Sequence, residues 1–163
     1  MLVIQMEWRK ILLIQNDSLE IIFRLGWATL FGALIGWERE LQNKPAGLRT
    51  NMLVSLGAAL FTLVPFQLDL VQISPDSLSR IIQGIITGVG FLGAGEIFSE
   101  SKPESNKPRV RGLTSAAAIW ISAALGVIAA CGLWEKGLIA VLMAWLILRG
   151  LKIVKKIKFF GRS

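Results

Sequence analysis

The chain has 163 residues, of which 53% are apolar and 18% charged, and its formal net charge is +7. Soluble domains usually contain fewer apolar and more charged residues, and a disordered chain would need low hydrophobicity, so disorder is excluded. Cys131 is the single cysteine and histidine is absent, which excludes an internal disulfide, the usual proton shuttle and a metal site built from His and Cys.

The N-terminal stretch, residues 1–20, combines apolar residues with Glu7, Arg9 and Lys10. A secretory signal would carry its positive charge before the apolar run and a small-residue cleavage site after it. Because neither feature is present, we expect an interfacial helix or an uncleaved lead-in.

Five apolar segments follow, and their lengths are close to the roughly 20 helical residues that cross a bilayer. The fifth segment is short and reaches that length if Arg149 and Lys152 extend to the interface. A soluble all-α domain would need polar outer faces that this chain lacks. The sequence therefore predicts an all-α integral membrane bundle of five transmembrane helices in a domain over 21–148, with spans at 21–37, 51–71, 81–98, 113–133 and 137–148.

The last segment, residues 149–163, contains six basic residues and no acid. This basic tail would form an amphipathic helix on an anionic membrane surface, or a disordered stop-transfer segment. Together with the first and third loops it places 13 basic residues on one side of the membrane and 5 on the other. The positive-inside rule then predicts an external N-terminus and a cytoplasmic C-terminus. Because the charge is concentrated in the tail, we expect no nucleic-acid partner.

Small residues recur at intervals suited to close helix packing in lipid, as in the GxxxG pattern. They predict a compact bundle, with a homodimer or another membrane protein as the partner options. The glycines between 84 and 95 exceed what packing needs, which leaves a kink, a broken helix or a close backbone approach open. The packing residues predicted in this way are Ala28, Gly32, Gly36, Gly84, Gly88, Gly93 and Gly126.

Polar residues gather at the predicted cytoplasmic ends of the spans. They would form either a salt-bridge girdle that fixes topology or a site for an ion or an anionic ligand. Glu38 and Glu96 are the candidate Mg²⁺ ligands, since carboxylate oxygens suit that ion. We expect Arg39, Arg49 or Arg111 to pair with Glu96, and Arg49 to neutralise Glu38, Glu40 or Glu96. The whole predicted polar cluster comprises Glu38, Arg39, Glu40, Lys44, Arg49, Thr50, Glu96, Arg111 and Thr114.

Three segments together resemble the MgtC/SapB family of bacterial membrane proteins. They are GALIGWERE at 32–40 with KPAGLRT at 44–50, QGIITGVGFLGAG at 83–95, and VRGLTSAAAIW at 110–120. The resemblance covers about residues 25–133. It implies a multi-pass protein of the cytoplasmic membrane, and it marks Glu38, Arg39, Lys44, Arg49, Thr50, Arg111 and Thr114 as functional positions.

The resemblance also implies a link to Mg²⁺ limitation, membrane-potential homeostasis and survival inside host cells. A regulatory role toward other membrane proteins, including the F-type ATP synthase, has been proposed for some members. This sequence departs from the family pattern in two ways: we expect a short form without the soluble C-terminal domain of many members, and Glu96 stands where the family usually has an apolar residue.

Two functions follow as hypotheses. The first is a non-enzymatic regulatory or accessory membrane protein without a resident cofactor, with Mg²⁺ as the one candidate ion. The alternative is a cation transporter or channel subunit whose path is lined by the glycine-rich third helix and Glu96. An intramembrane enzyme is disfavoured because the spans offer no nucleophile with a histidine base.

Overall fold

The computed structural model describes residues 18–68, 70, 74, 76–100 and 109–160. For residues 98–100, 109 and 150–160 it describes the backbone alone. The predicted lead-in therefore lies outside the described residues, apart from its last three, which begin the first helix. The described chain contains the helices α2 (Ser18–Leu41), α3 (Leu48–Gln67), α5 (Asp76–Glu96), α6 (Leu113–Ala130) and α7 (Trp134–Phe160).

The all-α prediction is confirmed, with one small addition. Two three-residue strands, β1 (Phe98–Glu100) and β2 (Arg109–Arg111), pair antiparallel between α5 and α6, with Phe98 opposite Arg111. Gly112 follows β2 with a φ of 91°, and a Cβ there would collide with the carbonyl oxygen of Glu96. Glycine is therefore required where the chain turns from the hairpin into α6.

Four of the described helices are long and apolar enough to cross a membrane: α2, α3, α5 and α6. Helices suit this setting because they satisfy every backbone group within the segment. Helix α7 is one uninterrupted helix from Trp134 to Phe160, so it contains the predicted fifth segment and most of the predicted tail, and no helix break marks residue 149. A fifth membrane crossing stays a prediction.

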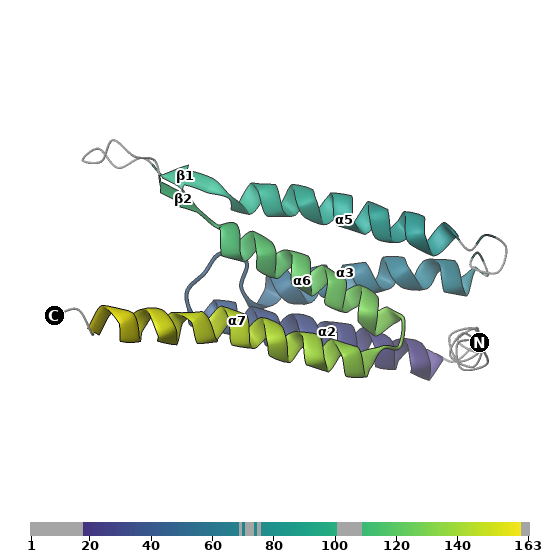
Figure 1. Cartoon of the computed structure of the whole chain (residues 1–163). Coiled ribbons are helices and arrows are strands. Elements are labelled where there is room, and N and C mark those ends of the chain that lie inside the picture. The colour runs from purple at the N-terminus through teal and green to yellow at the C-terminus, as the bar shows by residue number, and fades with distance from the viewer. Residues whose placement is uncertain (1–17, 69, 71–73, 75, 101–108, 161–163) are drawn as a thin grey trace.

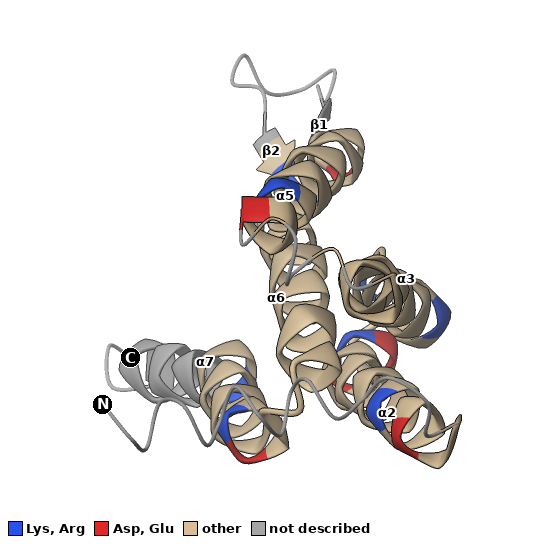
Figure 2. Cartoon of the chain, turned by 90° about the vertical axis from the view of Figure 1, so that its right-hand side faces the viewer, with Lys and Arg blue, Asp and Glu red and all other residues tan. Residues whose placement is uncertain are grey.

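The helices alternate in direction along the bundle (Figure 1). Helix α6 lies in the middle and contacts α2, α3, α5 and α7, as the end-on view in Figure 2 shows. Its small residues explain this position, because they let neighbouring helices approach closely.

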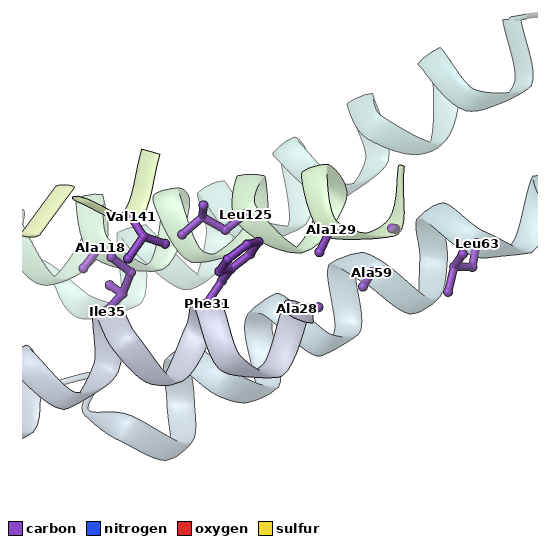
Figure 3. Packing of buried hydrophobic residues seen from close by; sticks show 10 residues of the cluster. Ala28, Phe31, Ile35, Ala59, Leu63, Ala118, Leu125, Ala129 and Val141 are labelled. Atoms are coloured by element: carbon purple, nitrogen blue, oxygen red, sulfur yellow. The ribbon is translucent and has the colours of Figure 1, made fainter. Parts of the chain in front are cut away.

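The main hydrophobic core forms between α2, α3, α6 and α7 (Figure 3). Phe31 of α2 is fully buried and lies among small residues such as Ala28, Ala59 and Ala129. Gly137 of α7 makes room for the Phe31 ring, which a Cβ at that position would overlap. Helix α5 is different, since only Val89 and Gly93 in it are buried.

Candidate functional site

The candidate site lies at one end of the bundle, where α2 and α5 end and α3 and α6 begin (Figure 1). We call it the hairpin end, because the β1–β2 hairpin extends from it. The sequence motifs around residues 38–51, 96 and 111–115 all meet there, so the structure brings the predicted junctions together at one end of the bundle.

Arg39 joins the last turn of α2 to the first turn of α6. Its side chain is only 2% exposed, and Nη2 donates a hydrogen bond of 2.7 Å to Ser115 Oγ. The Nε atom is buried and has no partner among the described residues. A buried guanidinium is thus held by one hydrogen bond between two helices, with donor capacity left over.

Glu38 is the neighbouring buried charge, at 3% exposure. Both of its carboxylate oxygens are buried without a hydrogen-bond partner in the described part of the chain. The carboxylates of Glu38 and Glu96 both interact electrostatically with the Arg39 guanidinium, although no ion pair within 4 Å is formed among these described groups. The Arg39 guanidinium thus compensates the two carboxylates through proximity rather than direct contact.

The turn between α2 and α3 is organised by Glu40 and Asn51. Glu40 Oε2 accepts a hydrogen bond of 2.9 Å from the backbone N–H of Leu48, and so it caps the start of α3. Asn51 Nδ2 donates to the carbonyl oxygens of Ala46 at 2.6 Å and Gly47 at 2.8 Å. The turn that these two bonds close includes Ala46, whose φ is 54°.

Buried polar side chains then connect α3 to α2 and α6. Ser122 Oγ of α6 donates to Asn51 Oδ1 at 2.7 Å, and Ser55 Oγ donates to the carbonyl oxygen of Ala28 in α2 at 2.7 Å. We call these groups, with the Arg39–Ser115 bond, the polar core; its members are Arg39, Asn51, Ser55, Ser115 and Ser122.

We expect the Asn51→Leu variant to lose about 2 kcal/mol of unfolding free energy. It removes one interhelical bond, to Ser122, worth about 0.6 kcal/mol in lipid, and two bonds to the turn before α3, each worth about 0.5–1 kcal/mol. The measurement is reversible unfolding in mixed detergent micelles. Thr62→Val is the matched control, since Thr62 is equally buried but bonds only to Ala58 in its own helix. Equal losses in the two variants would show that Asn51 has no special structural role.

The glycines predicted to mediate packing fall into two groups. A Cβ at Gly32 would lie 2.5 Å from the carbonyl oxygen of Asn51, and one at Gly36 would lie 2.7 Å from Leu48 Cα. A Cβ at Gly126 would overlap the carbonyl oxygen of Ser55. These three glycines therefore permit the close α2–α3 and α3–α6 contacts.

The glycines of α5 behave differently. A Cβ at Gly93 would make an ordinary 3.6 Å contact with Ala116, whereas nothing lies within 4 Å of a Cβ at Gly84 or Gly88. These last two therefore make no close packing contact within one described chain, because α5 packs on α6 through its other face, and their packing role stays a prediction. They border a cleft of about 740 Å³ between α3 and α5, lined by apolar residues and Arg80.

The remaining predicted polar residues lie on the surface of the hairpin end. Arg49 is exposed and forms no ion pair with Glu38, Glu40 or Glu96, so the predicted neutralisation by Arg49 is wrong in the described structure. The reason is that Glu38 is directed into the bundle while Glu40 caps α3. The other exposed members are Lys44, Thr50, Arg111 and Thr114, and Glu96 is half-buried.

The described residues do not assemble a Mg²⁺ cage. No group of three or more His, Cys, Asp or Glu side chains comes together in that part of the chain, and Glu38 is too buried to meet a hydrated ion. Since Mg²⁺ retains several waters and is usually held by only one or two carboxylates, ligation by Glu38 or Glu96 stays a prediction.

Arg24 organises the opposite end of the bundle. Its Nε forms an ion pair of 2.8 Å with Glu20, and Nη1 donates to the carbonyl oxygen of Ala130, the last residue of α6. The cation thus satisfies an end carbonyl and complements the helix dipole. An arginine inside an apolar span is the sequence signal that could have identified this contact.

Comparison with known proteins adds a family match over residues 25–157, to the MgtC family. Protein SrpB of Synechococcus elongatus is 46% identical over 94% of this chain and 86% of its own length. The "Putative magnesium transporter YhiD" of Escherichia coli K12 is 39% identical, and Protein MgtC of Salmonella typhimurium LT2 is 44% identical. The matches to these two cover 79% and 75% of this chain but only 59% and 48% of the relatives. No solved structure matches.

Proposed function

The chain belongs to the MgtC family, and on that premise we propose that it is a non-enzymatic accessory or regulatory protein of the bacterial cytoplasmic membrane. Its role is to support growth under Mg²⁺ limitation and to help maintain the membrane potential. The magnesium link is supported by the relative YhiD of Escherichia coli K12, which is named a putative magnesium transporter. The match covers only about half the length of the Salmonella protein MgtC. The activity of the longer relatives is therefore extended to this chain only as part of the proposal.

The observation that favours an accessory role over transport is the lining of the cleft beside α5. The transporter alternative requires the glycine-rich face of α5 to border a cation path. That face borders the α3–α5 cleft, whose lining contains no oxygen-bearing side chain and one cation, Arg80. A divalent cation needs oxygen ligands and is repelled by an arginine, so this cleft is poorly suited to conduct it.

The polar core supports the same proposal. Asn51, Ser55 and Ser122 satisfy one another and the adjacent backbone, so they fix helices rather than coordinate a passing ion. Polar contacts of this kind hold the hairpin end rigid. The exposed Lys44, Arg49 and Thr50 then form a fixed surface, on the side that the positive-inside rule assigns to the cytoplasm, at which a second membrane protein would bind.

The test is growth of a deletion strain at low Mg²⁺, complemented by plasmid-borne variants. We expect the wild type to restore growth, and Lys44→Ala with Arg49→Ala to fail although its level in the membrane is unchanged. Lys136→Ala is the matched control, because Lys136 is also exposed but lies at the opposite end. Full rescue by the double variant would contradict a partner surface at the hairpin end.

A further inference from the structure

The cleft between α3 and α5 is a feature that the accessory role does not explain. It has a volume of about 740 Å³. Its floor is closed, because Ala58 of α3 and Val89 of α5 belong to the same hydrophobic cluster, with Val54 and Ile85 packed against it. The cleft is thus a groove open to the side rather than a passage between two surfaces.

Glycines give the groove its space. Gly57 on α3 and Gly84 and Gly88 on α5 all line it, and nothing lies within 4 Å of a Cβ placed at any of them. A glycine inside a helix is unfavourable relative to alanine, and no packing contact in the described chain compensates for it here. Glycine at these three positions therefore leaves the groove unfilled.

Charge and length identify the occupant. Arg80 lines the groove at the end nearest the start of α5, is exposed, and forms no hydrogen bond or ion pair with a described residue. From Arg80 to Leu92 the helix rises by roughly 18 Å at 1.5 Å per residue, which matches the roughly 15 Å depth of one leaflet's hydrocarbon. An apolar groove of this length with an unpaired cation at its end complements an acyl chain that carries a phosphate.

We propose that a phospholipid binds in the α3–α5 groove, with one acyl chain lying over Gly57, Gly84 and Gly88 and its phosphate on Arg80. Bound in this way, the lipid completes the packing of α5, which the protein alone leaves with two buried residues. The site goes beyond the accessory role and is independent of it, since neither Lys44 nor Arg49 lines the groove.

The test is photocross-linking in phosphatidylglycerol vesicles that contain a trace of the same lipid with a diazirine on its acyl chain. Labelled peptides are mapped by mass spectrometry. We expect labels concentrated on α3 and α5 residues such as Leu53 and Phe61. Gly88→Leu fills the groove and abolishes this labelling, while Arg80→Gln lowers it about fivefold, the value of one arginine near an anionic membrane surface.

Gly90→Leu is the matched control. Gly90 lies on the same helix with nothing within 4 Å of its Cβ position, but it does not line the groove, so its labelling stays at the wild-type level. Equal labelling in all variants would show bulk lipid contact and overturn the proposal. Lipid labels missing from α3 and α5 of the wild type, together with a dimer in native mass spectrometry, would show a second chain in the groove and overturn it as well. Arg80 is exposed, so Arg80→Gln remains informative even if Gly88→Leu fails to fold.

Discussion

Replacing Gly126 by alanine is expected to lower the free energy of unfolding by about 3 kcal/mol, the upper range for an added methyl group in a tightly packed core. The new Cβ would overlap the backbone carbonyl oxygen of Ser55 and lie 2.8 Å from its carbon. A backbone cannot rotate away as a flexible side chain can, so α3 and α6 must separate. Their separation also strains the Asn51–Ser122 hydrogen bond.

Gly90→Ala makes the same chemical change, and we expect the opposite effect on the free energy of unfolding. Its Cβ meets no atom within 4 Å, and alanine is the better helix former, so stability rises by about 0.8 kcal/mol. Both values come from reversible unfolding in mixed micelles, followed by circular dichroism. Similar losses in the two variants would contradict the close α3–α6 contact.

Replacing Arg39 by methionine is expected to cost about 3 kcal/mol, because removing one member of a buried charge pair leaves the other uncompensated. The charge left behind is Glu38, which is 3% exposed and has no hydrogen-bond partner among the described residues. The variant also loses the bond from Arg39 to Ser115, which joins α2 to α6.

Adding Glu38→Gln to Arg39→Met is the informative control. The double variant has no buried charge at this position, so we expect it to recover more than half of the lost stability. The two residues are sequence neighbours and should therefore be energetically coupled. Strictly additive losses in the unfolding experiment would show that the charges of Glu38 and Arg39 do not compensate each other.

The helices could be predicted from the sequence because each apolar segment carries its own signal of length and composition. The predicted segment 81–98 corresponds to α5 (Asp76–Glu96), and 113–133 corresponds to α6 (Leu113–Ala130). The β1–β2 hairpin was missed because each three-residue strand is formed only through its pairing with the other, a contact that no local pattern encodes.

The candidate site was predicted only in outline. The sequence placed the charged junctions at one end of the bundle, but it could not show which face of α2 buries Glu38 and Arg39. It also overlooked Asn51, Ser55 and Ser122 as helix contacts, although polar residues spaced four or seven apart in apolar helices share one face. The sequence also could not show that Gly84 and Gly88 lie open within one chain, because a small-residue stripe has the same pattern whether it packs on a helix or borders a groove.

The most direct test of the accessory role is Mg²⁺ flux through purified protein in liposomes that enclose a magnesium-sensitive dye. We expect a flux equal to that of protein-free liposomes at every protein density, with an ionophore as the positive control. A flux that rises in proportion to the protein and is abolished by Glu96→Gln would contradict the accessory role and establish a cation path along α5.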